Sequence, residues 1–400
     1  MTVSRPPGRT TPQNLDDVVE AARIDVPLDG PASRELAPGT VRLYRLARYR
    51  FRLSTGEEVG VAIAGSGVPL VAVHGFAAEG LLYAQTLSRL VAMGFKVVAL
   101  DTPGHGATSA GGPTARLEDY VGLLKRALDE LGIRRAVLAG HSLGGRLVTQ
   151  LAADHPTKAI AVVPIDAIIG DTWDAMVGMF RVVPATYAAL AATLAADTVS
   201  TFPVLRNPGQ AVRLARLALP TGADHVRRPW RMVGPALSIV RSRSSTELLD
   251  AVAAEKVPLF VVHGDRDVAV PVCTARDAAI RGDGDLVVVH GASHSWMLKD
   301  PETLPGVLAD LLDDRLGDVL RGNLMAAGLD PDTAPRSLIE RRLLGPNAAI
   351  RRMSPDDSVV TTRGRHHRPR YRWSLHCRPV GVRGANGEAP ADVSMATAEG

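Results

Sequence analysis

The stretch that decides the fold is Ala136-Val137-Leu138-Ala139-Gly140-His141-Ser142-Leu143-Gly144-Gly145. It predicts a short apolar strand, a tight turn at Ser142 and a helix from about Leu143 to Asp154. Gly140 and Gly144 lie two residues on either side of the serine, which matches the G-x-S-x-G nucleophile elbow. Because such a strained turn tolerates little bulk nearby, glycines at these two positions fit its geometry. Ser142 is therefore the candidate nucleophile.

Strands and helices alternate on both sides of this stretch. Apolar runs predict strands at Leu70–Val73, Lys96–Leu100, Arg135–Ala139, Ala159–Ile165, Leu259–Val262 and Leu286–Val289. Helical periodicity marks Leu81–Met93, Leu117–Leu131, Val272–Ile280 and Leu304–Leu312. This alternation predicts an α/β fold with a mostly parallel sheet and helices on both faces. Residues 48–53 and 59–64, around a Gly-containing turn, predict a β-hairpin ahead of it.

The alternation stops after Asp166 and returns near residue 257. Residues 167–256 read as helices broken by prolines, so we expect a helical cap inserted between two halves of a core, 47–166 and 257–314. Residues 1–46 are expected to form a partly disordered N-terminal extension. Residues 315–400 are expected to form a partly disordered, Arg-rich C-terminal extension.

Composition narrows the classes of partner and location. The two cysteines cannot form a disulfide framework, and the eleven histidines show no H-E-x-x-H spacing. We therefore expect no metal site, and the serine chemistry described below requires no organic cofactor. The N-terminus has no apolar run typical of a signal peptide, which favours the cytoplasm.

The positive charge of the chain is concentrated near its end. Residues 315–400 hold fourteen arginines, no lysine and nine acidic residues, although the whole chain carries a net charge of only +4. Such a tail could attract anionic lipid, so peripheral membrane contact is an alternative to a solvated extension. The near-neutral body makes a nucleic-acid partner unexpected.

A serine hydroxyl needs a base, and the base needs an acid to orient it. Two late strands run into loops that supply both residue types. The first loop carries Asp265 and Asp267, and the second carries His294 after His290 in the strand. Ligand and catalytic groups belong at the carboxyl ends of strands in an open α/β sheet, where these loops lie.

An oxyanion hole requires two N–H donors. One is expected to be the N–H of Leu143, directly after the nucleophile, and the other that of Phe76, in the loop after the strand Leu70–Val73. Gly75 allows the backbone to turn sharply there. We also expect a set of side chains and one glycine to border the substrate: His74, Gly75, His141, Trp173, Phe180 and Trp296. Within this set, His141 is expected to pack or hydrogen-bond locally, and the aromatic residues of the insertion form an acyl pocket or the cap's own core.

Five motifs in order resemble the α/β-hydrolase superfamily, and in particular its cofactor-free, cap-bearing esterase, lipase and epoxide-hydrolase-like branch. They are His74-Gly75-Phe76, Asp101-Thr102-Pro103-Gly104-His105-Gly106, Gly140–Gly145, Gly264-Asp265-Arg266-Asp267 with Val270-Pro271, and Gly291-Ala292-Ser293-His294 with Pro301-Glu302. The resemblance covers roughly residues 47–314 and implies a triad of Ser142, His294 and Asp267. It implies hydrolysis of a small-molecule or lipid ester of an apolar acyl group through an acyl-enzyme on Ser142.

Several alternatives stay open from the sequence. Asp166, which ends a strand, could replace Asp267 as the acid of the triad. The same triad serves thioesterases, amidases or peptidases, C–C hydrolases and cofactor-free haloperoxidases, because the leaving group is not written in the motifs. A non-catalytic relative that binds a small ligand is the alternative from another class.

Overall fold

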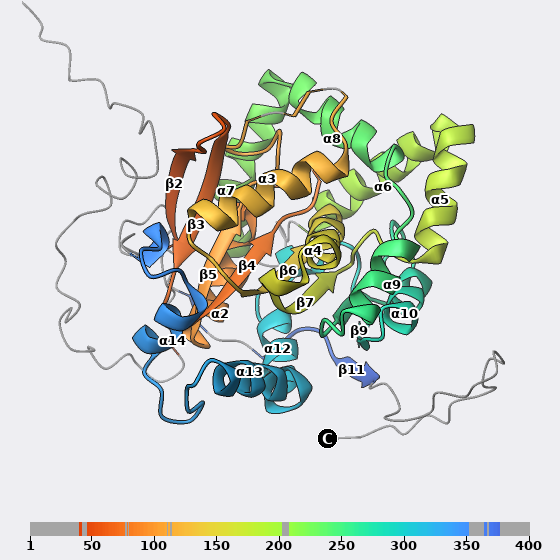
Figure 1. Cartoon of the computed structure of the whole chain (residues 1–400). Helices are drawn as coiled ribbons and strands as arrows, with labels where there is room; N and C mark the ends of the chain where they lie inside the picture. The colour runs from red at the N-terminus through yellow and green to blue at the C-terminus, as the bar shows by residue number, and fades with distance from the viewer. Residues whose placement is uncertain are drawn as a thin grey trace, which may run out of the picture.

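The computed structural model places one mixed sheet at the centre of the chain, with helices on both of its faces (Figure 1). The structure describes residues 40–41, 46–76, 78, 80–109, 111–112, 114–201, 208–351, 364–365 and 368–376. Most of the expected N-terminal extension and much of the Arg-rich segment lie outside the described residues.

Nine strands of the described residues form the sheet, in the order β11-β9-β8-β7-β6-β4-β5-β3-β2. Their bounds are β2 (Ala47–Arg52), β3 (Glu58–Ala64), β4 (Val68–Val73), β5 (Phe95–Leu100), β6 (Ala136–His141), β7 (Ala159–Ile165), β8 (Phe260–Gly264), β9 (Asp285–Val289) and β11 (Trp373–His376). The six inner strands are parallel, whereas β2, β3 and β11 pair antiparallel to their neighbours. A short separate ladder joins β1 (Thr40–Val41) to β10 (Gly364–Arg365).

The inner strands are buried on both faces, as their continuous apolar runs predict. On β4, Val71 and Val73 join the core cluster on one face, whereas Leu70, one position before Val71 and so on the opposite side of the pleat, joins the cluster on the other face. The first face is covered by α3 (Leu117–Glu130), α4 (Leu143–Asp154), α9 (Thr246–Ala254) and α10 (Val272–Arg281). The second is covered by α2 (Ala84–Ala92), α11 (Trp296–Lys299), α12 (Thr303–Asp313), α13 (Arg315–Ala326) and α14 (Arg336–Leu343).

Four helices form the cap between β7 and α9, and Figure 1 shows them at one end of the sheet. They are α5 (Asp171–Val182), α6 (Pro184–Ser200), α7 (Pro208–Arg227) and α8 (Trp230–Val240). The next helix, α9, lies inside the range expected for the cap but packs on the core, where Leu249 and Val252 share a cluster with Leu147 of α4. Among the described residues, no helix is long and apolar enough to cross a membrane.

Part of the C-terminal segment packs closely against the core. Strand β11 extends the sheet beyond β9, and the Trp373 indole Nε1 donates a hydrogen bond to Asp310 of α12 at 2.7 Å. Glu340 of α14 accepts a hydrogen bond from the Gly67 N–H at 2.9 Å and forms a buried ion pair with Lys96. The described residues of 315–400 thus include an edge strand and the two helices α13 and α14.

Candidate active site

The turn between β6 and α4 has the strained backbone that a nucleophile elbow requires. Ser142 adopts φ 54° and ψ −117°, a region that a residue with a Cβ rarely occupies and that costs about 1–3 kcal/mol. Its N–H donates to the carbonyl of Ile165 at 2.8 Å, which ties the turn to the end of β7. The serine is buried, with 7% of its surface exposed.

Close main-chain packing explains the glycines around this turn. A Cβ on Gly144 would lie 2.1 Å from the carbonyl oxygen of Val73, and one on Gly140 would lie 2.3 Å from that of Gly144. A Cβ on Gly75 would lie 3.1 Å from the Cβ of Ser142. The loop after β4 therefore lies directly against the elbow, and only residues without side chains allow that approach.

The two expected oxyanion donors lie on these two segments. Leu143 is the first residue of α4, so its N–H is among those that a helix leaves without an intrahelical acceptor. Phe76 lies in the turn after β4, next to Gly75. The N-terminal end of α4 also carries a partial positive charge that would stabilise an oxyanion beside Ser142.

The acid and the base lie at the same carboxyl edge of the sheet as Ser142, after the neighbouring strands β8 and β9. Asp267, in the loop after β8, accepts a hydrogen bond from Nδ1 of His294 at 2.6 Å. Its other oxygen accepts the N–H groups of Ala269 and Val270, both at 2.9 Å. The backbone therefore fixes the carboxylate, and the carboxylate fixes the tautomer and orientation of the imidazole.

The electrostatics of this pair favour an ion pair once the base takes a proton. Burial alone would lower the pKa of His294, but the negative charge and hydrogen bond of Asp267 raise it above the ordinary value. Burial alone would raise the pKa of Asp267, but the charge and hydrogen bond of His294 lower it. His294 is thus prepared to accept a proton beside a carboxylate that stays ionised.

Asp166, the alternative acid, has a different set of partners. One of its oxygens accepts the Gly264 N–H at 2.8 Å, and the other accepts the Trp296 Nε1–H at 2.6 Å. Burial, followed by the nearby charge of Asp267, raises its pKa well above the ordinary value. In this geometry Asp267 accepts the hydrogen bond that the His294 ring donates, and Asp166 anchors the loop and the helix around it.

Two histidines expected to border the substrate, His74 and His141, are held by hydrogen bonds within the protein. His74 accepts the Thr102 N–H at Nε2, so its Nδ1–H donates to the Gly75 carbonyl at 2.8 Å and holds the oxyanion loop. His141 contacts the Tyr83 hydroxyl and the His294 carbonyl, both at 3.0 Å. His141 therefore joins the elbow strand to η1 (Gly80–Tyr83) and to the loop that carries the base.

The aromatic residues expected at the substrate lie deeper than that role requires. Trp173 and Phe180 of α5 are both buried, with their rings edge to face at 5.9 Å, and they belong to the core cluster under the cap. Trp296 has no exposed surface, and its N–H is used by Asp166, so in this conformation it supports the acid loop instead of contacting substrate. Phe76, Met176 and Tyr187 remain partly exposed at the edge of the same cluster as Trp173.

Among the described residues, Asp166, His263 and Asp267 offer ligand atoms within 4.8 Å of one another. All three are buried, and they already have partners in the protein. His263 Nε2 donates to the Val270 carbonyl at 2.7 Å, and the two carboxylates hold the main chain, Trp296 and His294. These contacts describe a hydrogen-bonded acid loop.

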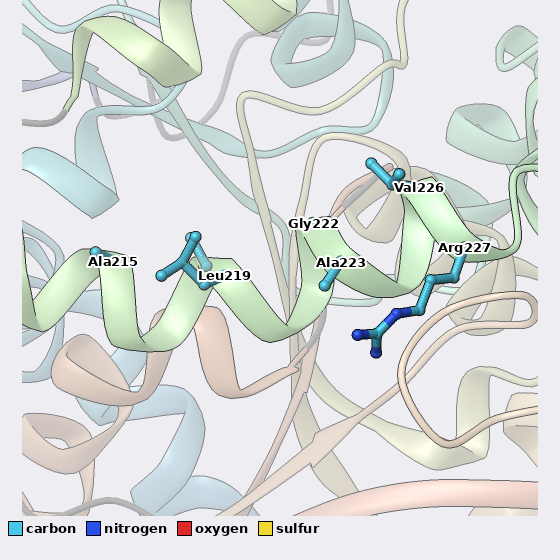
Figure 2. A pocket seen from close by; sticks show the side chains of 7 residues that line it. Ala215, Leu219, Gly222, Ala223, Val226 and Arg227 are labelled. Atoms are coloured by element: carbon cyan, nitrogen blue, oxygen red, sulfur yellow. The ribbon is translucent and has the colours of Figure 1, made fainter.

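A separate hollow lies along the cap helix α7 and has a volume of about 410 Å³. Figure 2 shows the side chains that line it. It is lined by small and apolar residues with one arginine: Ala215, Ala218, Leu219, Gly222, Ala223, Val226 and Arg227. None of the triad residues lines it. A second hollow of about 440 Å³ lies at the amino-terminal ends of β8 and β9, away from the triad, and its lining includes Asp285 and Arg315.

Residues 68–279 match the family described as the alpha/beta hydrolase fold. This region is more than half of the chain and contains β4 to β8 and the whole cap, so the chain belongs to the alpha/beta hydrolase family.

Solved structures agree on the fold. A carboxylesterase from Nitrososphaera gargenis has a TM-score of 0.53 at 20% identity, covering 68% of this chain and 99% of that chain. An esterase from Thermogutta terrifontis has a TM-score of 0.53 at 22% identity, covering 67% and 98%.

Curated relatives carry esterase, lipase and haloperoxidase names. A putative non-heme haloperoxidase from Mycobacterium phage D29 is 34% identical over 271 residues, which span 66% of this chain and 94% of the relative. A monoacylglycerol lipase from Mycolicibacterium smegmatis is 28% identical over 58% of this chain and 82% of the relative. A pimeloyl-[acyl-carrier protein] methyl ester esterase from Vibrio cholerae is 29% identical over 54% and 82%.

Sequence reasoning missed residues that act through the main chain of the site. Tyr83 and Thr102 hold the two motif histidines, and Asp197 of α6 accepts the N–H of Ser295, the residue after His294. One feature of the sequence does single out Asp197: it is the one charged residue in α6. Its partner lies 98 positions away in the chain, and no local pattern predicts that contact.

Proposed function

We propose that this protein is a serine hydrolase that cleaves carboxylic esters of apolar acyl groups through an acyl-enzyme on Ser142. The observation that carries the proposal is the 2.6 Å contact between His294 and Asp267, in a fold that places the strained Ser142 turn at the same edge of the sheet. An oriented histidine and a serine presented on a tight turn are the two parts that nucleophilic catalysis needs.

The reaction would proceed in two halves. Ser142 Oγ attacks the ester carbonyl while His294 Nε2 takes its proton, and the N–H groups of Leu143 and Phe76 stabilise the oxyanion. The C–O bond to the alcohol breaks, and His294 protonates the leaving oxygen. Water then attacks the acyl-enzyme with His294 as base, which releases the acid and restores Ser142. Asp267 stays ionised and stabilises the imidazolium throughout.

The preference for apolar acyl groups rests on the side chains that remain partly exposed near the core cluster. Phe76, Met176 and Tyr187 offer an apolar surface between the loop after β4 and the first cap helices. Aromatic and methionine side chains suit an adaptable acyl pocket. Thioesters, amides and C–C substrates would use the same residues, so they belong in the substrate panel.

The names of relatives support a second candidate activity. The phage relative is named a putative non-heme haloperoxidase. In the present chain, an acyl-enzyme on Ser142 could react with hydrogen peroxide in place of water. That step transfers the acyl group from Ser142 to peroxide, regenerates the hydroxyl and releases a peracid, which would oxidise halide. The activity would therefore require a carboxylic acid or ester as well as peroxide and halide.

The test is labelling with a fluorophosphonate probe, for wild type beside Ser142→Ala, followed by p-nitrophenyl esters of graded chain length. The proposal expects labelling of wild type alone and faster turnover of medium-chain esters than of acetate. Equal turnover of both chain lengths would contradict the apolar preference. A wild type that is neither labelled nor active would favour a protein that binds a small ligand without turnover.

A further inference from the structure

One peptide group next to the catalytic base is held from two sides. The carbonyl of His294 accepts a hydrogen bond from His141 Nε2 at 3.0 Å. The N–H of the same peptide, which belongs to Ser295, donates to Asp197 Oδ2 at 2.7 Å. His141 lies on β6 of the core and Asp197 on α6 of the cap. The main chain that carries the base therefore contacts both parts of the molecule.

On the core side, the hydrogen bonds of His141 define which of its ring nitrogens carries the hydrogen. Because a carbonyl can only accept, His141 Nε2 carries the hydrogen and Nδ1 is left to accept from the Tyr83 hydroxyl at 3.0 Å. Burial lowers the pKa of His141 to about 3, which keeps the ring neutral and this pattern fixed. The link between the elbow and the base loop is thus independent of pH in the working range.

The cap side depends on where α6 lies. Among the described residues of α6 no side chain is fully buried, and Asp197 is half-buried. A second contact joins the same helix to Ser295, since the hydroxyls of Thr198 and Ser295 are 3.3 Å apart. The Tyr187 hydroxyl, near the start of the helix, donates to the Ala236 carbonyl of α8 at 2.9 Å. If α6 moved away from the core, the Ser295 N–H would lose its acceptor.

The charge of Asp197 also acts on the base. Three carboxylates face His294 and favour its imidazolium: Asp267 after β8, Asp166 at the end of β7, and Asp197 of α6. Two histidines repel that cation when charged, His141 of β6 and His263 of β8. Of these five groups, Asp197 is the one that belongs to the cap, so its charge ties the electrostatics of the base to the position of α6.

We propose that Asp197 is a positioning residue through which the seated cap aligns the catalytic base. Its carboxylate holds the His294–Ser295 peptide so that the imidazole keeps its line between Asp267 and Ser142, and its charge stabilises the imidazolium. The proposal rests on the hydrolase function proposed above. It links closure of the cap over a substrate to the assembly of a competent triad.

Two variants separate the hydrogen bond from the charge. Asp197→Asn keeps a carbonyl oxygen that can accept the Ser295 N–H, whereas Asp197→Ala removes both acceptor and charge. We expect Asp197→Ala to lower kcat on a short soluble ester by roughly 10–100-fold with KM little changed, because a small misplacement of a catalytic group has costs of this order. Asp197→Asn should retain most of kcat and move the acid limb of the pH–rate profile to lower pH.

The control is Thr193→Ala, on the same helix, where the hydroxyl donates to the Ala189 carbonyl within α6. It should leave kcat and the pH profile unchanged. Fluorophosphonate labelling rates should fall in the same order as kcat, and thermal unfolding confirms that each variant is folded. Equal labelling rates for wild type and Asp197→Ala would overturn this inference and leave the hydrolase proposal standing. Absence of labelling in wild type would overturn both.

Discussion

The turn at Ser142 is held by main-chain contacts, whereas the cap helices reach the core loops through individual side chains. Around the elbow, Gly75, Gly140 and Gly144 let three backbone segments touch, and the surrounding residues are buried. The cap instead exposes large apolar side chains, such as Val182 at 81% and Val226 at 83%. The reacting groups therefore lie in the closely packed part of the molecule, whereas the cap leaves much of its apolar surface exposed.

The largest difference between the two regions should appear in the acid of the triad. We expect Asp267→Asn to lower kcat by about 10⁴-fold, because the wrong tautomer of the base is then favoured. His294 must be neutral to accept a proton, so the rate falls as pH drops through its pKa, which Asp267 raises. Removing that charge should therefore also move the acid limb to lower pH. A pH series of kcat measures both effects.

The control for that variant is Asp265→Asn, two residues away, where the carboxylate accepts the Gly291 N–H near the surface. It should keep kcat within a few-fold of wild type. Near-normal activity in Asp267→Asn together with a large loss in Asp166→Asn would assign the acid to Asp166 instead.

Packing at the elbow gives the next largest effect. In Gly144→Ala the added Cβ would lie 2.1 Å from the Val73 carbonyl oxygen and 2.6 Å from that of His74, and neither main-chain atom can move aside cheaply. We expect a loss of at least about 4 kcal/mol in the free energy of unfolding, which is exceptional for one methyl group. Urea denaturation checks this, and a variant of wild-type stability would contradict the packing described for the turn.

Attachment of the cap should be weaker and separable from the core. Arg231 of α8 donates to Asp224 at 2.8 Å and to the Thr108 carbonyl of the core at 2.6 Å. We expect Arg231→Ala to cost about 1–3 kcal/mol, mostly as local opening of α7 and α8. Hydrogen exchange should then rise in these helices while α4 stays protected. Equal loss of protection in α4 would show that cap and core unfold together.

The closely packed core could be predicted from the sequence better than the contacts of the cap and of the C-terminal segment. The elbow, the parallel strands and the order of acid and base come from short-range patterns, because glycine spacing, apolar runs and loop positions are local properties. The Asp197–Ser295 contact and the docking of β11 on β9 join residues far apart in the chain, so no periodicity marks them. The partner of the Trp296 indole N–H is also distant in the chain, because it is Asp166, 130 positions away.

The smallest expected effect tests the freedom of the cap at a single glycine. A Cβ on Gly178, inside α5, would meet nothing within 4 Å, in contrast to Gly144 inside the elbow. Since glycine in a helix interior costs about 0.5–1 kcal/mol relative to alanine, Gly178→Ala should stabilise the protein by up to that amount without changing kcat. Denaturation and ester turnover measured together check this. A fall in kcat at unchanged stability would mean that the site uses the flexibility of α5, and the cap would then take part in turnover through its motion as well as through its contacts.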